Sequence, residues 1–267
     1  MATYLDAILD THRRRATDDR RRTDVLVERA AALESTRGFR SALIEGDSLR
    51  VIAEIKRRSP SKGPLAPDLD PASLARAYRD GGASCLSVLT DSDHFGGSPE
   101  DLAAARSAVD LPVLRKDFTV AANDVCDARL MGADCVLLIV AALDDSELAD
   151  LTALAVELGL DVLVELHDED ELDRALEALG EKGLGSALLG VNQRDLVTFE
   201  VDQERAVRVG GRMPQGTVRV AESGVRGRHD AEALAAAGYH AVLVGEHLVT
   251  SDDPGAALAA LRVPLSR

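Results

Sequence analysis

Eight short apolar segments recur along the chain, and each is followed by an Ala- and Leu-rich stretch with helical periodicity. The starts of successive segments are roughly 22 to 34 residues apart, which is the length of one strand, one loop, one helix and a return turn. Near-continuous apolar runs are typical of parallel strands that helices cover on the outside. The segments are 51–56, 85–90, 113–116, 135–139, 161–165, 187–192, 217–222 and 241–245.

Eight strand–helix units favour a closed (β/α)8 barrel, the TIM-barrel fold, over an open doubly wound sheet, because no dinucleotide-binding glycine motif follows the first segment. Before the first strand, residues 3–45 read as helices, since Leu5, Ile8 and Leu9 recur at helical spacing. We therefore expect a single α/β barrel domain over residues 1–267, with residues 1–48 as an N-terminal helical extension.

Composition and charge argue against several classes of protein. The net charge of -15 disfavours nucleic acid as the main partner, because that binding depends on basic patches. No apolar run reaches the roughly 18 residues of a membrane helix, and the N-terminus lacks the pattern of a signal peptide. The three cysteines are neither closely paired nor at metal-ligand spacing. We expect a soluble, cytoplasmic protein with reduced cysteines and no metal site.

Polar residues close five of the eight segments. Alternation along a strand places Glu54 and Lys56 on one face, which suits either a wet site or the solvated face of an edge strand. In a (β/α)8 barrel, active-site residues lie at the carboxyl ends of the strands, so these side chains should converge at one mouth. The other polar residues in this position are Lys116, Asp117, Glu165, Asn192, Arg194, Glu222 and Ser223.

Two glycine turns, Ser223-Gly224 and Gly245-Glu246, follow the last two strands. Glycine lets the backbone approach a ligand, and free amides at a helix start favour an anion, so the two turns predict a phosphate site where this fold commonly has one. The alternative is that both glycines only form tight turns. The Glu246 carboxylate would repel phosphate, so only its backbone amide could contribute.

These groups suit acid–base chemistry on a phosphorylated, anionic small molecule. Lysine and arginine can hold its negative charge, and a lysine with a lowered pKa can transfer protons. Partial burial between Val164 and Leu166 is expected to raise the pKa of Glu165, so that it can serve as acid or base. His167 is expected to be a loop histidine rather than a catalyst. The sequence shows neither a serine nucleophile elbow nor a zinc motif.

Several motifs resemble those of the indole-3-glycerol phosphate synthase family, a family of (β/α)8 enzymes of tryptophan biosynthesis. In chain order they are AEIKRRSPSKG, LSVLTDSDHFGGS, LRKDF, GADCVLLI, LVELHDEDEL, LLGVNQRDL, VAESGV and LVGEHLV. The resemblance extends from about Tyr4 to the C-terminus. Related phosphate-binding barrels share the last two turns, but not the combination of the Lys56, Lys116-Asp117-Phe118 and Asn192-x-Arg194-Asp195 motifs.

The resemblance implies ring closure of 1-(2-carboxyphenylamino)-1-deoxyribulose 5-phosphate, with loss of carbon dioxide and water, to give indole-3-glycerol phosphate. It implies no cofactor and no metal. Lys116 would be the general acid on the sugar carbonyl oxygen, and Glu165 would assist the dehydration. Lys56 would pair with the substrate carboxylate or share in proton transfer, while Glu54 and Asn192 would hold the amine and sugar hydroxyls.

The resemblance also implies which residues bind the substrate. The residues around its anionic and aromatic part would be Arg194, Ser223, Glu222, Phe118, Phe95 and Leu137. Leu86 and Leu196 are further candidates for the apolar wall, although ordinary barrel packing would also explain all three leucines. Phosphate would be held by Ser59, Gly224, Gly245 and Glu246. The N-terminal extension would lie over the catalytic face, and residues 59–67 would form a lid segment.

Three other functions remain open from the residues. A barrel like phosphoribosylanthranilate isomerase would bind a similar substrate but has no use for Lys56, Lys116 and Arg194 together. A Schiff-base aldolase would use a strand-end lysine as nucleophile. A non-catalytic sugar-phosphate-binding barrel would bind without turnover. Association with other enzymes of the tryptophan pathway is also left open.

Overall fold

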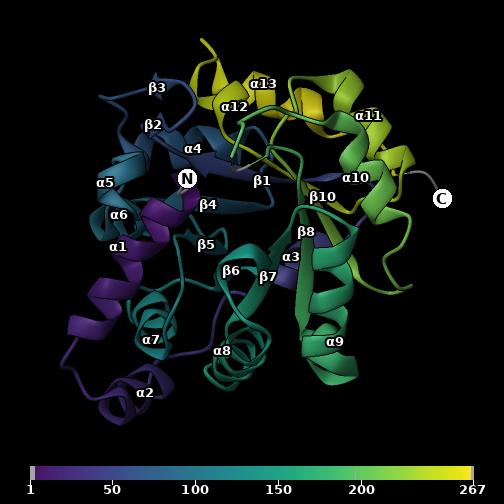
Figure 1. Cartoon of the computed structure of the whole chain (residues 1–267). Helices are drawn as coiled ribbons and strands as arrows, with labels where there is room; N and C mark the ends of the chain where they lie inside the picture. Colours follow the sequence, from purple (N-terminus) through teal and green to yellow (C-terminus); the bar gives the residue numbers. More distant parts are fainter. Residues whose placement is uncertain (1–3, 196, 266–267) are drawn as a thin grey trace.

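The computed structural model describes residues 4–195 and 197–265, within which eight parallel strands close into a barrel. Their order around the barrel is β1-β10-β9-β8-β7-β6-β5-β4, so each strand lies beside the next one in the chain (Figure 1). The predicted (β/α)8 barrel is confirmed, and the predicted segments differ from the strands by at most one residue at either end. The strands are β1 (Arg50–Ile55), β4 (Cys85–Leu89), β5 (Val113–Lys116), β6 (Cys135–Ile139), β7 (Asp161–Leu166), β8 (Ala187–Asn192), β9 (Val218–Glu222) and β10 (Ala241–Val244).

The barrel strands are buried on both faces, which explains their near-continuous apolar sequences. Every residue of β4, β6 and β8 is buried. Side chains that point inward fill the barrel, and those that point outward pack against the surrounding helices. Polar residues are therefore tolerated mainly at the strand ends, where the barrel opens.

The helices that follow the strands cover the outside of the barrel (Figure 1). Many begin with an acidic or hydroxyl cap; the Asp144 side chain, for example, accepts a hydrogen bond from the Glu147 amide. Within α9, Gly180 interrupts the helical backbone with a φ of 56°. The helices are α4 (Pro71–Asp80), α5 (Ser92–Phe95), α6 (Pro99–Ala108), α7 (Ala122–Leu130), η1 (Val140–Ala142), α8 (Asp145–Glu157), α9 (Glu169–Ser186), α10 (Gln203–Gly210), α11 (Arg228–Ala236), α12 (Glu246–Val249) and α13 (Pro254–Leu261).

From Tyr4 onward, where the description of the extension begins, it contains three helices, of which α1 (Tyr4–Asp18) lies over the mouth. Next, α2 (Thr23–Ala31) runs beside α7, where Arg21 pairs with Asp127 at 2.8 Å (Figure 1). The third helix, α3 (Phe39–Ile44), lies at the amino ends of the strands, where the Arg40 amide donates to Asp161 at the start of β7 (2.8 Å). The prediction of a cover over the catalytic face is confirmed for α1, whereas α2 and α3 continue to the opposite end.

The C-terminal segment joins the extension at that opposite end. Ser48 forms an isolated bridge with Pro264, and the Leu265 amide donates to the Asp47 carbonyl (2.8 Å). Among the described residues, no helix combines the length and the apolar character that crossing a membrane requires.

The predicted lid segment, residues 59–67, includes part of a small antiparallel hairpin. Its strands are β2 (Arg58–Ser59) and β3 (Gly63–Pro64). The amides of Leu65 and Ala66 return to the Arg57 carbonyl (2.8 and 3.0 Å), so the hairpin closes back on the end of β1.

Candidate active site

A cavity of about 700 Å³ opens at the carboxyl ends of the barrel strands. Cavities of this size hold small organic ligands. Fifteen of the site residues expected from the sequence line it, because parallel strands bring their carboxyl ends to one mouth. They are Glu54, Lys56, Ser59, Phe95, Lys116, Phe118, Leu137, Glu165, Asn192, Arg194, Glu222, Ser223, Gly224, Gly245 and Glu246. Their convergence is observed, and their individual roles stay predictions.

The charged centre of the cavity comes from three strands. Lys116, at the end of β5, donates from Nζ to Oε2 of Glu165 on β7 (2.6 Å) and to Oε2 of Glu222 on β9 (3.2 Å). Asn192 on β8 donates from Nδ2 to the other Glu165 oxygen (3.0 Å). Both glutamates are buried, where an unpaired charge would be costly. The strands therefore hold one ammonium group in a fixed place between two carboxyl groups.

The pKa of Glu222 lies above the usual value of a glutamate side chain, and the pKa of Glu165 lies below it. Burial raises the pKa of Glu222 to about 8, although Lys116 opposes the shift. Burial also favours a higher pKa for Glu165, but Lys116 and His167 outweigh it, and the pKa of Glu165 lies below its usual value. At neutral pH the site therefore offers a carboxylate at Glu165 and a protonated carboxyl group at Glu222.

One sequence-based expectation about protonation is wrong. The pKa of Glu165 was expected to rise, whereas the neighbouring cations lower it. For the lysines of the site, the sequence left open whether they bind negative charge or have a lowered pKa. Burial does lower the pKa of Lys116, but Glu165 and Glu222 outweigh burial and raise it above its usual value. Lys116 is therefore a cation that donates hydrogen bonds to both carboxyl groups.

A second ion pair lies at the end of β1, where Lys56 Nζ is 2.5 Å from Glu54 Oε1. The alternative of a solvated edge strand is excluded, because β1 pairs with both β4 and β10. A Cβ atom at Gly245 would overlap the Glu54 carboxylate. Glycine at this position thus leaves room for Glu54, in addition to forming the turn.

The two glycine turns lie beside each other at the cavity rim. Ser223 and Gly224 both have positive φ values, 65° and 74°, which is an uncommon conformation for serine. The Glu246 carboxylate, expected to repel phosphate, is paired with Lys62 (3.1 Å) and Arg194 (3.6 Å). These two cations reduce the repulsion, so the amides at the start of α12 remain suitable for an anion.

Aromatic and aliphatic side chains line the other part of the cavity. The rings of Phe95 and Phe118 have centroids 6.3 Å apart, and Leu137 lies in the lining with them. Leu86, in contrast, is fully buried in the barrel and does not line the cavity. Leu196 lies outside the described residues.

Sequence reasoning missed the residues that the extension and a loop contribute. Tyr4, Leu5 and Ile8 of α1 line the cavity, and Tyr4 meets Phe199 edge to face with a centroid distance of 5.6 Å. Phe199 has a φ of 60°, so its position depends on a loop conformation that no periodicity predicts. His12 could have been found, because it lies four residues after Ile8 and so shares the apolar face of the helix.

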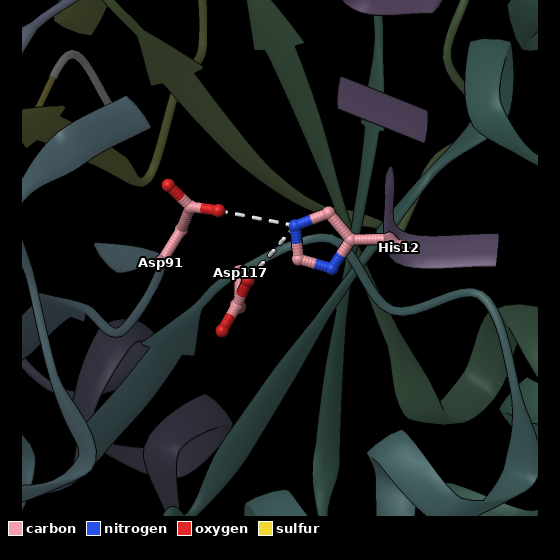
Figure 2. Close-up of side chains that lie close together, drawn as sticks. All are labelled: His12, Asp91 and Asp117. Carbon is pink, nitrogen blue, oxygen red and sulfur yellow. Dashed lines mark hydrogen bonds and ion pairs between the residues drawn. The ribbon is translucent and has the colours of Figure 1, made fainter. Parts of the chain in front are cut away.

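His12 attaches α1 to the barrel (Figure 2). Its Nε2 lies 3.1 Å from Asp91 Oδ2 and 3.9 Å from Asp117 Oδ1, and its ring is 5.3 Å from that of Phe118. All three polar side chains are buried. This contact therefore fixes the cover helix beside the residue that follows Lys116.

The cluster of His12, Asp91 and Asp117 has ligand atoms close enough to surround a metal ion. Every carboxylate oxygen in it, however, already accepts a hydrogen bond. Besides His12, Asp91 accepts from the His94 and Phe95 amides, and Asp117 accepts from the Phe118 amide, Thr90 and Arg115. Hydrogen bonding thus accounts for the arrangement of the cluster.

The barrel resembles solved structures of low sequence identity. One is thiamine phosphate pyrophosphorylase from Pyrococcus furiosus (TM-score 0.58, 16% identity, 80% of this chain and 93% of that one). Another is N-acetylmannosamine-6-phosphate 2-epimerase from Clostridium perfringens (TM-score 0.57, 12% identity, 74% and 86%). At these identities the similarity supports the fold alone.

Sequence relatives are much closer. "Indole-3-glycerol phosphate synthase 2" of Streptomyces coelicolor is 52% identical over 257 residues, covering 96% of this chain and 95% of that protein. The "Indole-3-glycerol phosphate synthase" of Mycobacteroides abscessus is 47% identical over 260 residues, covering 97% and 93%. The family model "Indole-3-glycerol phosphate synthase" matches residues 5–261. By these matches, this chain belongs to the indole-3-glycerol phosphate synthase family.

Proposed function

We propose that the chain closes the ring of 1-(2-carboxyphenylamino)-1-deoxyribulose 5-phosphate to form indole-3-glycerol phosphate, with loss of carbon dioxide and water, in tryptophan biosynthesis. The observation that carries this proposal is the ammonium group of Lys116 held between Glu165 and Glu222 (2.6 and 3.2 Å). Membership of the family supports it. So does the cavity, which combines charged side chains, apolar side chains and two glycine turns suited to a phosphate.

Ring closure needs an acid at the sugar carbonyl. Lys116 protonates the carbonyl oxygen while the aromatic carbon that bears the carboxylate attacks the carbonyl carbon, forming the new carbon–carbon bond. Carbon dioxide then leaves, and its bonding electrons restore the aromatic ring. Lys56 holds the carboxylate before it leaves, while Glu54 and Asn192 orient the amine and hydroxyl groups. The cavity lining places all these side chains around one space.

Dehydration needs both an acid and a base. Glu222, protonated at neutral pH, gives a proton to the departing hydroxyl group. Glu165, ionised, removes a proton from the methylene carbon next to the ring nitrogen. Lys116 and Glu222 thus donate one proton each and Glu165 recovers one, so each turnover consumes one proton.

The rest of the cavity fits the remaining parts of the substrate. The amides of Gly224, Gly245 and Glu246, with the Ser59 hydroxyl, hold the phosphate, and Ser223 lies beside them. Arg194 positions the anionic part. Phe95, Phe118 and Leu137 pack on the anthranilate ring.

The test is a steady-state assay of the full chain with this carboxyphenylamino sugar phosphate, followed by the fluorescence of the indole product. The chain contains no Trp, so the protein itself adds no indole emission. Lys116→Ala should abolish indole formation while substrate binding is largely kept. Lys182→Ala, at an exposed lysine of α9 outside the cavity, is the matched control and should retain activity.

The same assay separates the competing functions. Turnover without an indole product would indicate an isomerase. A substrate adduct trapped by borohydride would indicate a Schiff-base aldolase. Binding without turnover, unaffected by Lys116→Ala, would indicate a non-catalytic barrel. Each of these outcomes would overturn the proposal.

We further propose a cytoplasmic location, a single domain over residues 1–267, and association with other enzymes of the same pathway. The acidic net charge of -15 and the absence of a membrane-spanning helix among the described residues support the first of these.

A further inference from the structure

His167 lies beside the catalytic cluster, next to Glu165. It follows β7 and does not line the cavity. Its Nε2 is 3.6 Å from Glu165 Oε1, and its Nδ1 is 3.1 Å from Glu171 Oε2. The Nε2 atom is buried and has no hydrogen-bond partner among the described residues. A buried ring nitrogen without a partner, aimed at a carboxylate, needs an explanation.

The proposed reaction requires a proton from solvent in every turnover, because two are donated and one is recovered. The mouth is covered by α1, whose Tyr4, Leu5 and Ile8 line the cavity. A route that does not pass through the occupied mouth would allow a proton to return to the site in each turnover.

Glu165, His167 and Glu171 form such a route. Glu171 lies in the first turn of α9, and its side chain is 16% exposed, so it reaches water. It also accepts the His167 backbone amide (2.8 Å), which fixes the ring between the two glutamates. The gap of 3.6 Å on the Glu165 side is longer than a hydrogen bond, and a small rotation of the ring closes it.

The charges around His167 favour an imidazolium. Burial lowers the pKa of His167, but Glu171, Glu165 and Glu222 outweigh it, and the pKa lies above its usual value. The charge of Lys116, on the other side of Glu165, is paired with Glu165 and Glu222. The ring can therefore carry a proton at neutral pH.

We propose, on the basis of the proposed function, that His167 is a positioning residue that relays protons from solvent at Glu171 to Glu165. The imidazolium gives its Nε2 proton to Glu165, which leaves a neutral ring with its remaining proton on Nδ1. Rotation of the ring about its Cβ–Cγ bond then turns the bare Nε2 away from Glu165 and toward Glu171, which passes on one proton from water and restores the imidazolium, and the reverse rotation returns the ring. From Glu165 the proton reaches Glu222 through Lys116, which is hydrogen-bonded to both (2.6 and 3.2 Å). His167 does not touch the substrate and acts through Glu165.

The test compares His167→Gln with the wild type in the indole assay between about pH 6 and about pH 9. Glutamine keeps a polar group beside Glu165 but carries no titratable proton. We expect kcat to fall about 10- to 100-fold, with KM changed less than about twofold. Both His167 and Glu222 lose their protons at alkaline pH, so we expect the wild-type kcat to decline in two steps and His167→Gln to keep only the step that belongs to Glu222.

A second variant and a control complete the experiment. Glu171→Gln keeps both hydrogen bonds to His167 but cannot take up a proton, so it should lower kcat in the same way. It tests the relay independently should His167→Gln fail to fold. His229→Gln, at an exposed histidine of α11, should behave as the wild type. Normal kcat in either test variant, or a loss of equal size at every pH, would overturn the relay. A wild-type protein that forms no indole would instead overturn the proposed function.

Discussion

The attachment of α1 gives a prediction that separates the cover helix from the barrel. His12 donates from Nε2 to Asp91 Oδ2 at 3.1 Å, in a buried position. A hydrogen bond to a charged group contributes about 1.5–3 kcal/mol. In His12→Ala, Asp91 keeps its hydrogen bonds from the His94 and Phe95 amides (2.6 and 3.2 Å), so no further penalty for an unpaired charge arises. With about 1.4 kcal/mol for each factor of ten, the open population of α1 should rise about 10- to 100-fold.

Trypsin measures that population, because α1 contains three consecutive arginines, Arg13, Arg14 and Arg15. When reclosing is faster than cleavage, the cleavage rate follows the fraction of open helix. The barrel should stay folded, since the opening is local. KM should rise as well, because α1 lines the cavity.

Asp10→Ala is the matched control for this experiment. It also raises the helix propensity of α1, but Asp10 is exposed and outside the attachment to the barrel. If His12→Ala is cleaved no faster than Asp10→Ala, the view that His12 holds the cover closed is refuted.

Three further predictions concern the cavity. The pKa of Glu222 is about 8 in the folded chain against a usual 4.5, so only the unfolded chain releases this proton between the two values. The free energy of unfolding of the wild type should therefore fall as the pH rises from 4.5 to about 8, and that of Glu222→Gln should not, which urea unfolding at several pH values measures. Gly245→Ala should lower kcat/KM at least about tenfold, because its Cβ overlaps the Glu54 carboxylate, and a normal value would contradict that geometry. Phe199→Leu should raise KM a few-fold with kcat nearly unchanged, which steady-state kinetics would measure.

The strand ends were predictable because parallel topology turns sequence order into position. Once eight strands are assigned, Lys116, Glu165 and Glu222 must lie at the same mouth, whatever their separation in the chain. Apolar character alone was sufficient to locate the strands, since helices cover them all.

Protonation was not predictable, because it depends on neighbours from other strands. The flanking residues of Glu165 suggested a raised pKa, whereas the Lys116 ammonium at 2.6 Å reverses the direction. The same limit applies to His167, whose place beside Glu165 depends on how the chain turns after β7. A loop conformation decides the position of Phe199. Helical spacing puts His12 on the apolar face of α1, but only the docking of that helix decides that it meets Asp91.

The bridge between Ser48 and Pro264 brings the last described residues to the amino ends of the barrel strands. The mouth with its cover helix is at the other end of the barrel. A tether attached to the C-terminus, whether to a solid support or to a second enzyme, therefore leaves substrate entry and product exit unobstructed.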